Sequence, residues 1–221
     1  MINALLTAYG LIIFAACVFF FFITVSNILW LMHTLTIERK KTGPSVAVLI
    51  PARNEALRIR PCIDSLLCQN YSSYQIYVID DNSSDETWNI LQSYMIRFPS
   101  KFKAFKAEPL PEGWYGKPHA LQELAAHVKE DYLLCTDADT IHKPDSISKA
   151  IAAADKYKAD LITGYPHHSM PTFAEAAVVP SMYILTMLGM PLYLIPATKS
   201  PLFSHAIGQF MLFKRSFFEK I

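Results

Sequence analysis

The sequence predicts a membrane-spanning helix followed by an α/β domain built on a mostly parallel sheet. Residues 1–37 contain no Asp, Glu, Lys or Arg, and beyond them short apolar runs alternate with segments of helical periodicity. That alternation is typical of βαβ units, in which crossover helices join parallel strands. One apolar run ends in Asp137 and Asp139, and ligands of open α/β sheets bind where strands end in this way.

The amino-terminal segment is long and apolar enough to cross a bilayer once, over about residues 5–31. A cleaved signal peptide is the alternative, disfavoured because the segment lacks a basic start and a small-x-small cleavage site. Trp30 stands where an interfacial aromatic belongs, and the basic run 39–41 follows, so the positive-inside rule places the rest of the chain in the cytoplasm. We therefore expect a cell-membrane protein with a single-pass anchor over 1–37, a basic juxtamembrane linker over 38–44 and a cytoplasmic domain over 45–221.

Composition argues against several classes of protein and site. The formal net charge is +1 and no basic cluster is larger than residues 39–41, so we expect no nucleic acid as a partner. The four cysteines show no C-x-x-C or other paired metal spacing, so we expect free thiols and no zinc site. A hydrophobic content of 52% suffices for a substantial core.

The elements of the predicted domain follow one another at short intervals. Residues 45–51 are almost continuously apolar, as a strand is in a parallel sheet that helices cover on both faces. Residues 59–69 place apolar side chains at helical spacing. Ser84, Asp85 and Glu86 indicate the capping hydroxyl and first-turn acids of a second helix. We expect further strands over 75–80, 101–107, 132–136 and 160–163, and further helices over 118–128 and 144–157.

The character of the sequence changes beyond Gly164. Residues 176–198 carry no charge and are rich in Met, Leu and Tyr. Pro180, Pro191 and Pro196 divide this segment into pieces too short to span a membrane easily. The segment therefore lies on the membrane surface, lines an apolar groove or belongs to the core, and the sequence leaves these alternatives open.

Polar residues follow three of the predicted strands. Asp137 and Asp139 point the same way on an extended chain and can share one hard cation, Mg²⁺ or Mn²⁺, although an Asp-rich turn without a ligand is the alternative. Residues 51–55 and 80–87 follow the first two strands, where acids can accept hydrogen bonds from a base and from ribose hydroxyls. Lys117 begins a predicted helix and can neutralise a diphosphate.

Three other motifs are excluded. An EF-hand loop starting at Asp81 would need glycine at its sixth position and glutamate where Gln92 stands. No G-x-G-x-x-G follows the first strand, and residues 113–118 have neither the spacing nor the Ser or Thr of a P-loop. A nucleotidyltransferase is disfavoured because it needs a glycine-rich loop after the first strand.

Four stretches in order make a more specific pattern: Pro-Ala-Arg-Asn-Glu at 51–55, Asp-Asp-Asn-Ser-Ser-Asp-Glu-Thr at 80–87, Gly-Trp-Tyr-Gly-Lys-Pro-His-Ala-Leu at 113–121 and Thr-Asp-Ala-Asp at 136–139. In this set the sequence resembles the family 2 glycosyltransferases, whose GT-A fold is a Rossmann-like, mostly parallel sheet flanked by helices. Within that family it looks most like the membrane-anchored branch of 4,4'-diaponeurosporenoate and hopanoid-associated glycosyltransferases. The resemblance covers about residues 45–221.

The resemblance implies transfer of a sugar from a UDP-sugar to a lipid acceptor of polyisoprenoid, carotenoid or hopanoid type, as in carotenoid biosynthesis. It implies Mg²⁺ or Mn²⁺ as cofactor, bound by the D-x-D pair Asp137 and Asp139. The donor nucleotide would contact Pro51, Arg53, Glu55, Asp80, Asp81, Lys117 and Asp137. Of these, the first three would line the uridine side of the cleft, and the adjacent aspartates would hold the base or the ribose.

An inverting transferase also needs a general base, usually a carboxylate, that takes the proton of the acceptor hydroxyl. By the same resemblance that base follows Ile221, so the catalytic residue is unknown and the domain over 45–221 is expected to be truncated at its carboxyl-terminal end. The alternative function is that of a catalytically incomplete donor-binding fragment or scaffold. The sugar, the acceptor and the oligomeric state stay open.

Overall fold

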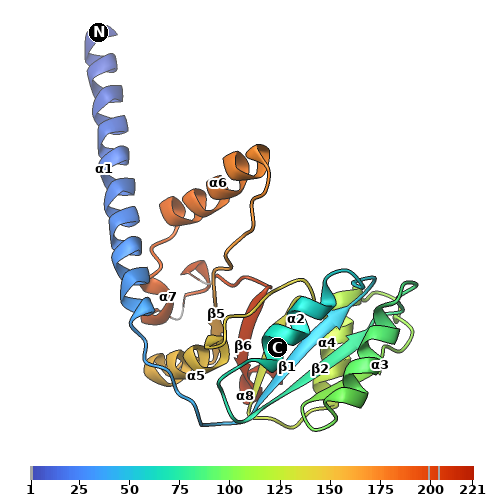
Figure 1. Cartoon of the computed structure of the whole chain (residues 1–221). Coiled ribbons are helices and arrows are strands. Elements are labelled where there is room, and N and C mark those ends of the chain that lie inside the picture. The colour runs from blue at the N-terminus through green and yellow to red at the C-terminus, as the bar shows by residue number, and fades with distance from the viewer. Residues whose placement is uncertain (1, 199, 204) are drawn as a thin grey trace. The chain divides into compact units, whose positions relative to one another are not determined.

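The computed structural model describes residues 2–198, 200–203 and 205–221 (Figure 1). The chain divides into two compact units, Met1–Ile37 with His167–His205, and Glu38–Pro166 with Ala206–Ile221. We call the first the helical unit and the second the sheet unit. The boundaries that the sequence predicts for anchor, linker and domain stay a prediction.

The sheet unit is built on a sheet with the strand order β3-β2-β1-β4-β6-β5. Its strands are β1 (Val46–Ala52), β2 (Tyr74–Asp80), β3 (Phe102–Lys106), β4 (Tyr132–Thr136), β5 (Leu161–Thr163) and β6 (Phe210–Lys214). The first four are parallel, and β6 runs antiparallel between β4 and β5. This confirms the predicted α/β fold with a mostly parallel sheet. Ala52 pairs with Asp80 and Leu49 with Cys135, so β1, β2 and β4 end at one edge.

Helices cover both faces of the sheet. One face carries α2 (Ile59–Leu67), α3 (Thr87–Arg97) and α5 (Ser146–Tyr157), and the other carries α4 (Gly116–Ala126) and the short α8 (Arg215–Phe218). Alternate residues of β1 are divided between the two cores: Val46, Val48 and Ile50 on one side, Ala47 and Leu49 on the other. A strand buried on both faces must be apolar at each position, and this explains the continuous apolar run.

The basic linker is bound to the sheet unit. Arg39 Nε lies 3.1 Å from Asp145 Oδ2, and Lys40 pairs with Asp155 of α5. The backbone N–H of Ser72 donates to the carbonyl of Lys41 (3.0 Å). Charges that the sequence assigns to the membrane surface therefore also attach the linker to the domain.

The helical unit contains α1 (Ile2–Leu35), α6 (Phe173–Gly189), α7 (Leu194–Ala197) and a 3₁₀ turn, η1 (Pro201–Phe203). Among the residues that the structure describes, two stretches are long and apolar enough to cross a membrane by length and composition, Ile2–Thr34 and Phe173–Ala197. The first contains the span predicted over residues 5–31.

α6 differs from the prediction of separate pieces because it continues through Pro180. A proline removes one helical N–H donor, but the loss of one backbone hydrogen bond does not by itself end a helix. The start of α6 is fixed by a capping box between Thr172 and Glu175, in which each side chain bonds to the backbone N–H of the other residue.

The start of α3 and the strand β6 also differ from prediction. α3 begins at Thr87, and Ser84 provides no capping bond, because Asp85 lies before the helix and accepts hydrogen bonds from the N–H and hydroxyl of Thr87 (2.9 and 2.5 Å). The sequence analysis expects no strand over residues 210–214, which pair with β4 over a long separation in sequence.

Candidate active site

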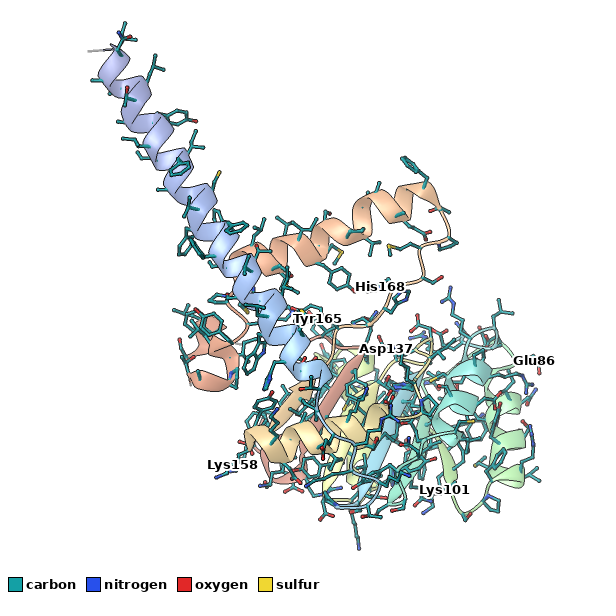
Figure 2. The ribbon with its side chains drawn as sticks, turned by 60° about the vertical axis from the view of Figure 1, so that its left-hand side comes forward. Glu86, Lys101, Asp137, Lys158, Tyr165 and His168 are labelled. Carbon is teal, nitrogen blue, oxygen red and sulfur yellow. The ribbon has the colours of Figure 1, made fainter. Side chains whose placement is uncertain are left out.

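A cleft of about 380 Å³ lies at the edge where β1, β2 and β4 end. Figure 2 shows Asp137 at this end of the sheet and Lys101, which precedes β3, at the opposite end. The cleft is lined by Pro51, Ala52, Arg53, Glu55, Asp81, Gly116, Lys117, Asp137, Ala138 and Asp139. The structure thus brings together every donor-site residue predicted from the sequence except Asp80.

The loops after β1 and β2 are fastened to each other by hydrogen bonds. Asn54 N–H donates to Ser83 Oγ (2.9 Å), and Ser84 N–H donates to Asn54 Oδ1 (2.8 Å). Glu55 N–H donates to the hydroxyl of the fully buried Thr87 (2.9 Å). Asn54 has a φ of 56°, a left-handed conformation that asparagine adopts more readily than most residues. These polar residues therefore fix the loop that carries Arg53 and Glu55.

The carboxylates of the cleft are close enough to affect one another. Burial raises the pKa of Glu55, Arg58 opposes that shift, and the negative charges of Asp139, Asp85 and Asp137 raise the pKa further. Arg58 Nη1 lies 3.8 Å from Glu55 Oε2. Acids from the loops after β1 and β4 therefore create a negative potential that a cation would relieve.

Two basic side chains balance this charge. Lys117 Nζ pairs with Asp137 Oδ1, and Arg53 Nη1 lies 3.8 Å from Asp81 Oδ2. Gly116, at the start of α4, lies so close to Asp81 that a Cβ atom would be 3.0 Å from Asp81 Oδ2. Glycine at this position therefore lets the helix start approach the aspartate.

Asp80 lies beneath the cleft. Only 2% of the surface of Asp80 is exposed, and its Oδ1 has no hydrogen-bond partner among the described residues. The backbone N–H of Asp81 donates to Ala52 O (2.8 Å), which turns the Asp81 side chain towards the cleft and leaves Asp80 inside.

The amino-acid sequence matches the family model described as Glycosyl transferase family 2 over residues 47–221. The chain belongs to this family. Among curated proteins, the chain is 27% identical over 154 residues to 4,4'-diaponeurosporenoate glycosyltransferase of Staphylococcus aureus (strain bovine RF122 / ET3-1). The aligned stretch covers 67% of this chain and 38% of that protein. The chain spans less than half of the length of the curated relatives that it matches.

Two solved structures of similar fold come from glycosyltransferases. The mannosyltransferase PcManGT from Pyrobaculum calidifontis, in complex with GDP-Man and Mn²⁺, aligns with a TM-score of 0.62 at 18% identity over 94% of this chain and 56% of that chain. Residues 1–349 of S. aureus TarS, in complex with UDP-GlcNAc, align with a TM-score of 0.52 at 19% identity over 80% and 47% of the two chains. At these identities the likeness shows the fold alone. It confirms the predicted GT-A fold.

Thr136 and His142 support the D-x-D loop of this family 2 chain; the sequence pattern includes Thr136 but predicts no role for either residue. Thr136 Oγ1 donates to the carbonyl of Gln209 (2.8 Å) and lies 3.1 Å from His142 Nε2. The backbone N–H of His142 donates to Ser65 Oγ (2.9 Å). Burial lowers the pKa of His142 to about 4, so its ring is neutral near pH 7. The only sequence signal for this supporting role is the position of Thr136 directly before Asp137.

A second, larger cavity of about 1010 Å³ shares Lys117 with the cleft. It lies along α4, β6 and α8 and is lined mainly by apolar side chains, among them Leu121, Met211, Phe213 and Phe218. Apolar surface and donor-site charge therefore meet at Lys117.

Proposed function

We propose that the protein is a membrane-anchored glycosyltransferase that moves a sugar from a UDP-sugar to a lipid acceptor, with metal assistance and inversion at the anomeric carbon. The observation that carries this proposal is the convergence of Asp81, Lys117, Asp137 and Asp139 on one cleft. Family membership and the naming of UDP-GlcNAc in the TarS complex support a nucleotide-sugar as donor.

In this proposal the two sides of the cleft bind different parts of the donor. Pro51, Arg53 and Glu55 line the uridine side, on the loop that the Ser83 and Thr87 hydroxyls hold in place. Asp81 accepts hydrogen bonds from base or ribose, and Asp80 beside it in sequence is buried. Lys117 exchanges its pairing with Asp137 for the diphosphate, to which a lysine is attracted as a point charge.

Asp137 and Asp139 fit a divalent cation because they are hard oxygen ligands in a cleft whose acids repel one another. Among the described residues, no three or more His, Cys, Asp or Glu side chains are grouped to hold a metal ion by themselves. Diphosphate oxygens would therefore complete the coordination of Mg²⁺ or Mn²⁺, and the Mn²⁺ of the PcManGT complex supports such a metal. When bound, the metal offsets the charge that develops on the leaving nucleoside diphosphate.

Two observations support a lipid acceptor: the apolar cavity beside Lys117, and the similarity to 4,4'-diaponeurosporenoate glycosyltransferase. A carboxylate acceptor has already lost its proton at neutral pH, so its attack on the anomeric carbon needs no base. A hydroxyl acceptor needs a general base that takes its proton as it attacks.

We propose α1 as the membrane anchor, with the sheet unit on the cytoplasmic side. Its candidate span covers Ile2–Thr34, and the basic run 39–41 follows it. In this proposal the sheet unit is tethered to the membrane that contains the lipid acceptor.

A calorimetric titration of UDP and UDP-glucose into the full chain in detergent, with Mn²⁺ and then with chelator, tests the donor site. We expect binding that requires the metal and that the Asp139→Ala variant loses while its circular dichroism spectrum stays unchanged. Undiminished UDP affinity in that variant, or no binding by a folded wild-type chain, would contradict the proposal.

A further inference from the structure

A buried amide connects the two long helices of the helical unit. Asn27 is 0% exposed although it lies within the apolar helix α1. Its Nδ2 donates to the carbonyls of Met187 (2.9 Å) and Met190 (2.7 Å), and its Oδ1 accepts from Leu192 N–H (2.7 Å). The last carbonyls of a helix have no partner within the helix, so Asn27 caps the carboxyl-terminal end of α6.

The serine and threonine side chains of both helices bond to the backbone of their own helix. In α6, Ser181 donates to Val178 O (2.6 Å) and Thr186 to Met182 O (3.0 Å). In α1, Thr7, Thr24, Ser26 and Thr34 donate to carbonyls three or four residues earlier. Internal bonding of this kind is what a helix needs in hydrocarbon, where water offers no alternative partner.

The surface of α6 is apolar on all sides. None of its residues is buried, and Val178, Met182 and Leu185 are more than 60% exposed. Its one charged residue, Glu175, lies in the first turn and belongs to the capping box. A water-exposed helix would carry polar residues along one face, and α6 does not.

We propose that α6 is embedded in the hydrocarbon of the membrane, in the leaflet that surrounds the carboxyl-terminal part of α1, and that Asn27 holds it there. This inference rests on the proposed anchoring of α1. The 17 residues of α6 rise about 1.5 Å each, about 25 Å in all, which is less than the roughly 30 Å of the hydrocarbon core, so we infer that α6 enters the hydrocarbon without crossing it. Figure 1 and Figure 2 show the carboxyl-terminal end of α6 beside the carboxyl-terminal half of α1, with the start of α6 farther from it.

Fluorescence quenching in vesicles tests this placement. The full chain, with the exposed Cys17 and Cys68 changed to serine, receives one cysteine at an exposed apolar position: Leu185→Cys in α6, Leu29→Cys in α1 or Ile96→Cys in α3. Each variant carries an environment-sensitive fluorophore in vesicles of phosphatidylethanolamine and phosphatidylglycerol. We expect spin labels on lipid acyl chains to quench the labels at 185 and 29, and aqueous iodide to quench the label at 96.

Labels at the three positions distinguish the hypothesis that α6 is embedded from the hypothesis that α1 is the membrane anchor. If the label at 29 is quenched by lipid while the label at 185 behaves as that at 96, α6 lies in water and the inference is wrong although the anchor stands. If neither helix is quenched by lipid, the anchor itself is wrong.

Two substitutions test the role of Asn27. Asn27→Ala leaves two carbonyls and one N–H unpaired, so we expect iodide quenching of a label at Met190→Cys to rise about twofold or more. Ser26→Ala is the matched control, because its hydroxyl bonds only to Ile23 O of its own helix. Equal quenching in both variants would show that Asn27 does not hold α6.

Discussion

The loops after β2 and β4 have similar polar sequences but different roles in the structure. After β2, Thr87 donates to Asp85, and Ser83, Asp85 and Thr87 each accept a backbone N–H from the loop after β1. After β4, Asp137 and Asp139 line the cleft, and their loop is held by Thr136 and His142 from outside it. Polar residues at a strand end can thus build a site or support one, and hydrogen-bond partners distinguish the two.

The largest expected effect concerns binding by the loop after β4. Asp137→Asn removes a charge from the D-x-D pair, and we expect metal-dependent UDP affinity to fall about 100-fold, as when one member of a close charge pair is removed. Calorimetry with Mn²⁺ measures this, and a thermal melt should show little change because the side chain is part-exposed.

Asp85→Asn is the matched control in the loop after β2. Asp85 accepts hydrogen bonds from Thr87 and Ala56, which hold its pKa below the usual range. We expect a lower melting temperature and binding that still depends on the metal. If Asp85→Asn abolished the metal dependence, the proposed division between the two loops would be wrong.

Strand ends could be predicted from sequence, but the connections between them could not. The apolar runs at β1, β2 and β4 each end in polar residues, and parallel strands bring such ends to one edge. β6 was missed because its partner β4 lies more than 70 residues earlier in sequence: Thr136 pairs with Phe210. Likewise, no local pattern distinguishes Asp81, which lines the cleft, from Asp80, which is buried beneath it.

A second prediction concerns the support of the loop after β4. Burial lowers the pKa of His142 from 6.5 to about 4, so between these values the unfolded chain binds a proton that the folded chain does not. The contribution of the neutral His142 to the free energy of unfolding is therefore fully present above about pH 6.5 and is lost as the pH falls towards 4. At pH 5 the loss from this group is about 2 kcal/mol.

Chemical denaturation at pH 7 and pH 5 measures this loss, and His142→Gln serves as the comparison because glutamine does not titrate. We expect the pH dependence of the variant to be smaller by the amount that His142 contributes. If His142→Gln and the wild type had the same pH dependence of unfolding, the ring of His142 would be protonated in the folded wild type at pH 5. Its bond to Thr136 would then not require the neutral form.

The smallest effect concerns the support within the loop after β2. Thr87→Val keeps the shape of a fully buried side chain but removes the oxygen that accepts Glu55 N–H and donates to Asp85. Leaving that N–H unpaired should lower the free energy of unfolding by about 1.5 kcal/mol. Thr87→Ser keeps the hydroxyl and is the control for volume.

Because Thr87 does not line the cleft, UDP affinity should change only through the position of Glu55, by less than in Asp137→Asn. A loss of binding in Thr87→Val as large as in Asp137→Asn, with unchanged stability, would place Thr87 among the ligand-binding residues and remove the distinction between the two loops.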